Sequence, residues 1–126
     1  MGDMAAVDDI LAAARTRIAP RVAPADLDTV LASQALVVDI RPGELRRRDG
    51  PLEGAVVVER TVLEWRLDPT SPHRLDRIHS PDQRVVIVCD EGYASSLAAA
   101  VLRDLGLTNV TDLEDGFQGW RAHRGR

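Results

Sequence analysis

Residues 85–100 read VVIVCDEGYASSLAAA, and this stretch decides the fold. Its first four residues are aliphatic and mostly β-branched, which predicts a buried parallel strand. Cys89 follows directly, and a short polar loop leads into a run of strong helix formers that starts at Leu97. Ser95 and Ser96 are candidate N-cap residues of that helix. The stretch therefore predicts a strand, a loop and a helix, with Cys89 at the carboxyl end of the strand.

This position makes Cys89 a candidate functional residue. In an open α/β sheet, ligands bind in the crevice outside the carboxyl ends of the strands. Loop N–H groups and a helix N-terminus there favour an anion, whether a substrate or a thiolate, and they make a cysteine sulfur a better nucleophile. A lone cysteine is more commonly an inert small hydrophobic residue. The place of Cys89 in the predicted sheet favours the functional role.

Composition and charge narrow the class of protein. A chain of 126 residues, 44% hydrophobic and 29% charged, is typical of one globular domain with its own core. A net charge of −4 indicates no general affinity for nucleic acid or for an anionic membrane. The chain has no lysine, which excludes Schiff-base chemistry and a phosphate-loop lysine. No apolar run could span a membrane, no secretory signal opens the chain, and a single cysteine suits the cytoplasm.

Strands and helices are predicted to alternate along the chain. The expected strands are 21–22 (a short edge strand), 35–40, 55–58, 84–88 and 110–113. The expected helices are 3–18, 24–32, 61–67, 74–78, 95–106 and 117–121. This order predicts an α/β fold with a mostly parallel sheet and helices on both faces. The first helix, with Asp3 as a candidate cap, either packs on the domain or mediates dimerisation, and we favour packing. The basic run 46–48 is interpreted as a solvated face rather than an anion site.

Three motifs then resemble, in order, those of rhodanese-like domains. The residues DIR at 39–41 with EL at 44–45, followed by GPLEGA at 50–55, resemble the family's "DVR…E-F…GHIPGA" region. Residues 85–102 resemble the active-site strand, loop and helix of that family. Residues 113–120, LEDGFQGW, resemble its "L-x-G-G-F-x-x-W" ending. The resemblance spans about residues 21 to 122. It divides the chain into an N-terminal helical extension, 1–19, and a rhodanese-like domain, 20–126.

The resemblance implies a five-stranded, mostly parallel sheet with helices on both faces, plus the extra N-terminal helix. It also implies a sulfurtransferase that moves a sulfane sulfur through a Cys89 persulfide, from a small donor to a thiol or protein acceptor. Cys89 is then the nucleophile, and no metal or organic cofactor is required. The sequence makes no prediction of the oligomeric state. The loop would cradle the sulfur with its backbone N–H groups, which are those of Asp90, Glu91, Gly92, Tyr93, Ala94 and Ser95.

The loop also departs from the family pattern. Ala94 stands where the family commonly has an arginine or lysine, while Asp90 and Glu91 add negative charge. This argues against thiosulfate as donor. The two carboxylates either select a neutral or cationic donor or a basic protein, or belong to a solvated loop, the interpretation we favour slightly. The alternative function is a catalytically weak binding or redox-sensing module. A cation from another loop could come from Arg41, Arg60 or Arg66.

Loop length separates this chain from phosphatases of the same general design. Six residues run from Cys89 to Ala94 before the predicted helix, whereas related phosphatases and arsenate reductases have a longer loop that ends in arginine. The seventh position here is Ser95. Without the arginine, a phosphoryl transition state would lose bidentate charge stabilisation. The three histidines have no metal-ligand spacing with one another or with Cys89, so a metal site is not expected.

Overall fold

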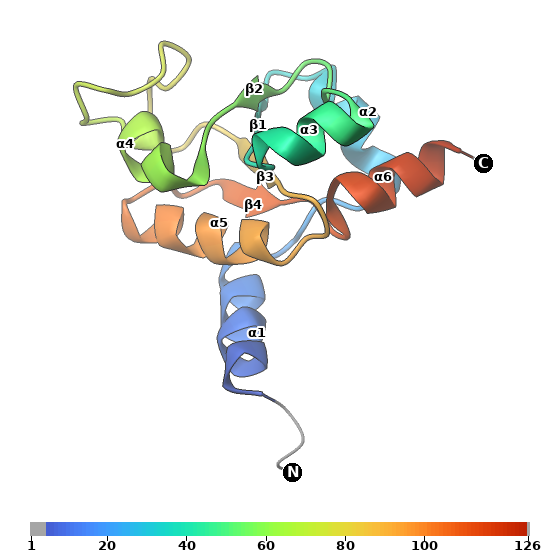
Figure 1. The fold of residues 1–126 in the computed structure, drawn as a ribbon. Coiled ribbons are helices and arrows are strands. Elements are labelled where there is room, and N and C mark those ends of the chain that lie inside the picture. The colour runs from blue at the N-terminus through green and yellow to red at the C-terminus, as the bar shows by residue number, and fades with distance from the viewer. Residues whose placement is uncertain (1–4, 126) are drawn as a thin grey trace.

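The computed structural model describes residues 5–125 and contains a parallel four-stranded sheet (Figure 1). The strand order is β2-β1-β3-β4. Each strand is short, and the two central strands are buried on both faces, which explains their unbroken aliphatic runs. The strands are β1 Leu36–Asp39, β2 Val56–Val57, β3 Val85–Val88 and β4 Val110–Asp112.

The register brings the carboxyl ends of the strands to one edge of the sheet. Asp39 lies opposite Val88, and Ile87 lies opposite Asp112. Cys89 is the first residue after β3, so it emerges between the ends of β1 and β4. This is the crevice that the sequence predicts for Cys89.

The sheet has four strands rather than the five that we expected. The fifth position is occupied by Val22, which forms one isolated parallel bridge with Leu113. Its N–H donates to Asp112 O at 2.9 Å, and its carbonyl accepts from Glu114 N at 2.8 Å. Pro20 and Pro24 flank this segment. Because proline cannot donate to a ladder, the pairing does not extend into a strand.

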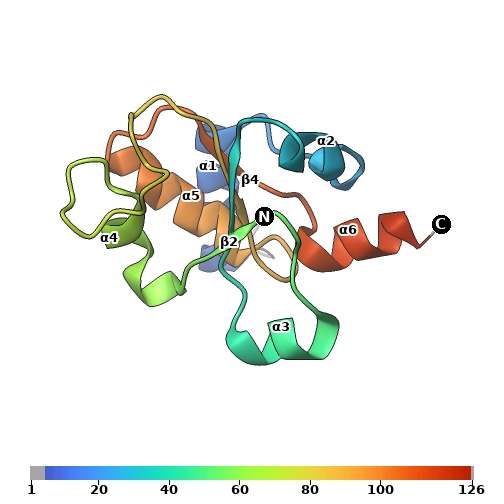
Figure 2. The same ribbon diagram turned by 90° about the horizontal axis from the view of Figure 1, so that it is seen from above.

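Helices cover both faces of the sheet, as predicted (Figures 1 and 2). Along β3, alternate side chains enter two separate cores, as the pleat requires. The core that includes Val85 and Ile87 also takes in residues of three helices: α1 Ala6–Ile18, α4 Leu63–Leu67 and α5 Ala94–Asp104. The opposite core, which includes Val86 and Val88, takes in residues of α2 Leu27–Leu31 and α6 Gly116–Arg124.

The N-terminal helix packs on the domain rather than standing free. Ala14 and Ile18 of α1 are buried in the core under α5, while Val7 and Ile10 are exposed on its first turns. Figure 1 shows α1 projecting from the α5 side of the sheet. The described helix starts at Ala6, and the candidate cap Asp3 lies outside the described residues. No helix within residues 5–125 has the length and apolar composition needed to cross a bilayer.

Several local predictions are corrected. The expected helix 24–32 is a 3-10 turn, Pro24–Asp26, followed by α2, and the expected helix 61–67 likewise begins with a 3-10 turn, Arg60–Val62. The segment 74–78 forms turns instead of a helix. The side chain of Gln83 holds it, accepting from His79 N at 2.8 Å and donating to Arg77 O at 2.9 Å. The sequence also gave no signal for α3 Gly43–Asp49, and the predicted turn 117–121 belongs to the longer α6.

Candidate active site

Cys89 lies in a loop that folds back over its own sulfur. The residue is 6% exposed, and its Sγ accepts hydrogen bonds from Gly92 N at 3.1 Å and Ser95 N at 3.3 Å. Gly92 has a φ of +87°, and a Cβ there would lie 2.8 Å from Asp115 N. Glycine is therefore required at this turn. Two of the predicted loop amides, those of Gly92 and Ser95, point at the sulfur.

The hydroxyl of Ser95 forms the third polar contact of the sulfur. Its Oγ lies 3.2 Å from Cys89 Sγ and donates to Asp112 Oδ2 at 2.7 Å. The Ser96 hydroxyl donates to the same Oδ2 at 2.7 Å. These serines are not N-caps, because α5 begins at Ala94 and both lie in its first turn. A hydroxyl has one hydrogen, so Ser95 can serve the carboxylate while it accepts from a thiol, or turn to donate to a thiolate.

Asp112, the last residue of β4, is fully buried, and its carboxylate lies behind the cysteine loop, where it accepts from the Ser95 and Ser96 hydroxyls. Arg21 Nε donates to its Oδ1 at 2.7 Å, and Arg21 Nη2 donates to Gly92 O at 3.1 Å. Burial opposes the charge on Arg21, but the hydrogen bond and attraction of Asp112 outweigh it and raise the pKa of Arg21. The sequence reasoning missed both residues. The signal that could have identified Asp112 is a carboxylate at the end of a predicted aliphatic strand.

The N-terminal helix also reaches this loop. Arg15 Nη2 of α1 donates to Gly92 O at 2.7 Å, and its Nε donates to Ser96 Oγ at 3.1 Å. Its guanidinium carbon lies 5.5 Å from the centre of the Tyr93 ring. Tyr93 is itself 60% exposed. The Gly92 carbonyl is therefore held by two arginines, neither of which the sequence reasoning singled out.

The remaining loop side chains contact other partners or solvent rather than the sulfur. Asp90 Oδ1 accepts from Gln118 Nε2 at 2.9 Å, so this carboxylate is tied to α6. Glu91 and Ala94 are exposed. The interpretation of a solvated loop thus describes Glu91, whereas Asp90 is partly covered and has a specific partner.

The N-terminus of α6 fixes the backbone at Cys89. Phe117 N donates to Cys89 O at 2.9 Å, and Gln118 N donates to Asp90 O at 3.0 Å. Gly116 has a φ of +60°, and a Cβ there would lie 2.5 Å from Asp90 O and 2.6 Å from Cys89 O. The close approach of α6 to the loop therefore depends on glycine at this position.

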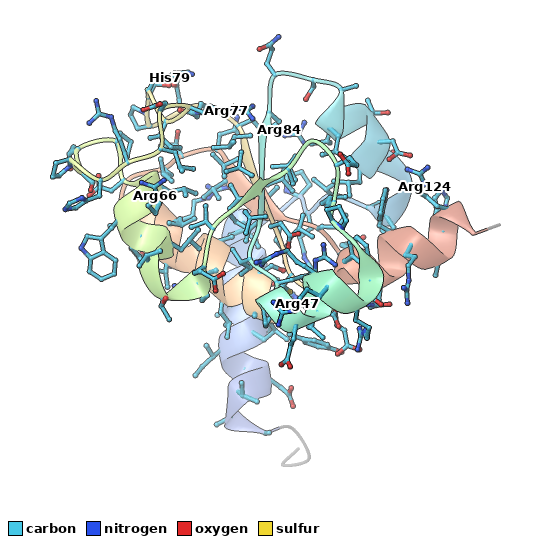
Figure 3. All side chains as sticks on the ribbon, turned by 45° about the horizontal axis from the view of Figure 1, so that its top comes forward. Arg47, Arg66, Arg77, His79, Arg84 and Arg124 are labelled. Carbon is cyan, nitrogen blue, oxygen red and sulfur yellow. The ribbon has the colours of Figure 1, made fainter. Side chains whose placement is uncertain are left out.

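Each of the three arginines considered as substitute cations has a partner outside the cysteine loop, although Nη1 of Arg41 is buried without a hydrogen-bond partner among the described residues. Arg41 is fully buried, pairs with Asp39 at 2.8 Å and stacks 3.8 Å from the centre of the Phe117 ring. Two further contacts occupy the others: Arg60 pairs with Glu64 at 2.9 Å, and Arg66 donates to His73 O at 2.7 Å. The basic run 46–48 belongs to α3, where Arg47 and Arg48 are exposed and Arg46 is half-buried; Figure 3 labels Arg47 on this helix.

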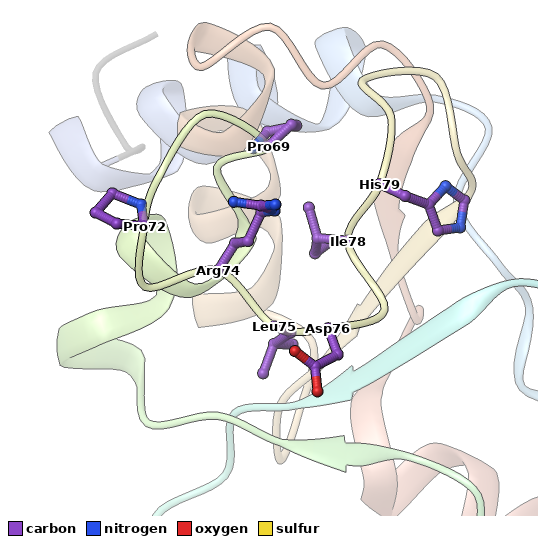
Figure 4. Close-up of a pocket in the computed structure, with 7 residues that line it drawn as sticks. All are labelled: Pro69, Pro72, Arg74, Leu75, Asp76, Ile78 and His79. Carbon is purple, nitrogen blue, oxygen red and sulfur yellow. The ribbon is translucent and has the colours of Figure 1, made fainter.

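The molecule also has a hollow of about 430 Å³ away from the cysteine loop (Figure 4). It lies in the long connection between α4 and β3, and none of its lining residues belongs to residues 89–95. It is lined by Pro69, Pro72, Arg74, Leu75, Asp76, Ile78 and His79.

Comparisons with known proteins identify the fold. Residues 23–123 match the model of the rhodanese-like domain family. A protein of Pseudomonas entomophila (strain L48) named thiosulfate sulfurtransferase GlpE is 31% identical over 102 residues, which cover 81% of this chain and 84% of the relative.

Two solved structures extend the likeness. A Rhodopseudomonas palustris CGA009 protein of unknown function, RPA3614, described as a possible tyrosine phosphatase, is 32% identical with a TM-score of 0.84. The match covers 100% of this chain and 98% of that one. The human single-domain sulfurtransferase TSTD1 is 24% identical with a TM-score of 0.69, over 82% of this chain and 96% of that one. With its parallel sheet, its cysteine loop and the family match over residues 23–123, the chain belongs to the rhodanese-like domain family.

Proposed function

We propose that the protein is a sulfurtransferase in which Cys89 carries the transferred sulfur as a persulfide. The observation that supports this most directly is the pair of amide hydrogen bonds from Gly92 and Ser95 to Cys89 Sγ. Amides aimed at a sulfur stabilise negative charge on it at little cost in reorganisation. The name of the Pseudomonas relative points to the same class of reaction.

The proposed reaction has two halves. The Cys89 thiolate attacks the sulfane sulfur of a small donor, an S–S bond forms, and the bond from that sulfur to the donor breaks. The donor leaves with the bonding electron pair. An acceptor thiolate, free or on a protein, then attacks the terminal sulfur, and Cys89 leaves as the thiolate that began the cycle. The Ser95 hydroxyl can turn from Asp112 to the sulfur whenever the sulfur is anionic.

Thiosulfate is proposed to be a poor donor for this loop. Ala94 offers no charge to a dianion, and Asp90 and Glu91 repel it. A neutral or cationic donor avoids this repulsion, and a singly charged anion reduces it. The test is mass spectrometry of Cys89 after incubation with thiosulfate, 3-mercaptopyruvate and polysulfide, with Cys89→Ser as the control. We expect one added sulfur atom on Cys89, with thiosulfate the slowest donor. If the wild-type thiol gains no sulfur from any of the three, the sulfurtransferase proposal fails.

Two other functions compete with this proposal. The Rhodopseudomonas structure is described as a possible tyrosine phosphatase, but here α5 begins at Ala94 and the loop lacks an arginine for a phosphoryl group. The exposed Glu91 and the missing loop cation favour a binding or redox-sensing module as the second candidate. A binding module would bind its partner with Cys89→Ser as well as with the wild-type chain, whereas a redox sensor would lose its response in Cys89→Ser; in both cases Cys89 would form no persulfide.

A further inference from the structure

The helix α1 lies before the matched family region, yet it supplies part of the cysteine loop's support. Arg15 contacts the Gly92 carbonyl and the Tyr93 ring of the loop, and the Ser96 hydroxyl in the first turn of α5. Gly92 receives Arg15 on its carbonyl and gives its N–H to Cys89 Sγ. Only one residue therefore separates the guanidinium from the sulfur along this chain of hydrogen bonds.

Within residues 5–125, Arg15 forms no direct ion pair with a carboxylate, and Asp112 is linked to it only through the Ser96 hydroxyl. Both of its hydrogen bonds go to neutral oxygens, those of Gly92 and Ser96. Its neighbours differ in this respect: Arg17 pairs with Asp104 at 2.6 Å, and Arg21 pairs with Asp112 at 2.7 Å. Arg15 is thus a half-buried cation beside the loop that has no direct carboxylate partner in the described part of the chain.

We propose that Arg15 replaces, from outside the loop, the positive charge that Ala94 does not provide, and that it stabilises the thiolate and persulfide of Cys89. The inference rests on the proposed function and extends it. Arg15 is a positioning residue in this view, because it acts on the sulfur through Gly92 and by its field.

The other charged groups near the loop do not supply this charge. Arg21 and Asp112 form a pair and largely cancel. The loop itself contributes Asp90 and Glu91, and Asp115 precedes α6. All three are acidic, so they oppose a thiolate. Among these groups, the positive charge that favours a Cys89 thiolate therefore comes from Arg15 of α1.

The test measures the rate of alkylation of Cys89 against pH in four full-length chains: the wild type, Arg15→Gln, Arg15→Lys and the matched control Arg17→Gln. We expect Arg15→Gln to move the midpoint of the profile upward by about one pH unit, the scale of one nearby opposite charge. Arg15→Lys should keep the midpoint close to that of the wild type, since it keeps the charge. Arg17→Gln changes the same helix and should not move the midpoint.

Three results would overturn the inference. One is a midpoint for Arg15→Gln equal to that of the wild type. Another is a midpoint for Arg15→Lys that moves as far as that of Arg15→Gln, which would make the role one of geometry alone. The third is an equal shift in Arg17→Gln, which would indicate a general effect of α1. Alkylation needs no sulfur donor, so these outcomes are separable from the persulfide test. Thermal unfolding of each variant confirms that the compared chains are folded.

Discussion

Replacement of Gly116 by alanine tests whether the approach of α6 fixes the cysteine loop. The new methyl group would lie 2.5 Å from Asp90 O and 2.6 Å from Cys89 O, so α6 and the loop must separate. The φ of +60° by itself costs alanine about 1 kcal/mol. Separation also weakens the bonds from Phe117 N to Cys89 O and from Gln118 N to Asp90 O, at about 1 kcal/mol each. We expect a total loss of about 3 kcal/mol of unfolding free energy.

Gly106→Ala is the matched control for this experiment. Gly106 has a φ of +99°, and a Cβ there would meet nothing within 4 Å, so the control carries the backbone cost without the clash. Chemical denaturation should give a loss of about 1 kcal/mol for Gly106→Ala, and the difference of about 2 kcal/mol is the contribution of the contact. Gly116→Ala should also slow alkylation of Cys89, whereas Gly106→Ala should not. Equal losses of stability in the two variants, with equal alkylation rates, would refute the reasoning.

Three further predictions concern groups around the loop. Ser95→Ala removes a buried hydroxyl that contacts both Cys89 and Asp112; we expect a loss of about 1 kcal/mol in urea denaturation and slower alkylation of Cys89. Asp39→Ala leaves Arg41 buried without its partner and should cost about 3 to 5 kcal/mol by the same measurement. The hydrogen bond from Arg48 lowers the pKa of Asp49 in the folded protein. The ionised Asp49 carboxylate therefore stabilises the fold above the ordinary carboxyl pKa, and this stabilisation is lost as the pH falls below about 4. The urea midpoint of the wild type should therefore drop more steeply there than that of Asp49→Asn.

The strand, the loop and the helix around Cys89 were predictable because their signals are local. A β-branched run, a glycine and a stretch of helix formers lie within sixteen consecutive residues. The reduced fifth strand at Val22 was not predictable from the segment alone, since pairing there is decided by the flanking prolines and by Leu113. The assignment of Ser95 as an N-cap failed because Asp112 binds its hydroxyl, and tertiary contact outweighed the capping preference.

The groups behind the loop were missed for a different reason. Arg15 precedes Gly92 by 77 residues, and Arg21 precedes Asp112 by 91. In the sequence, Arg15 is an ordinary arginine near the end of a helix, and Arg21 is one beside Pro20. Only the register of β4 against β3 brings Asp112 to the carboxyl edge, and only the packing of α1 on α5 brings Arg15 to Gly92.

These contacts connect the stability of the fold to the chemistry of the sulfur. The loop amides can stabilise an anion only if their direction is held, because a loop free to rotate would turn them toward water. Here the start of the loop is held by the hydrogen bond from Phe117 N of α6 to Cys89 O. The middle of the loop is held at Gly92 O, which accepts from Arg15 and Arg21. Of these two arginines, Arg15 also brings positive charge to the loop, since Arg21 is paired with Asp112. A loop that lacks its own cation can thus remain suited to an anionic sulfur if α1 stays docked, which gives the N-terminal helix a reason to pack on α5.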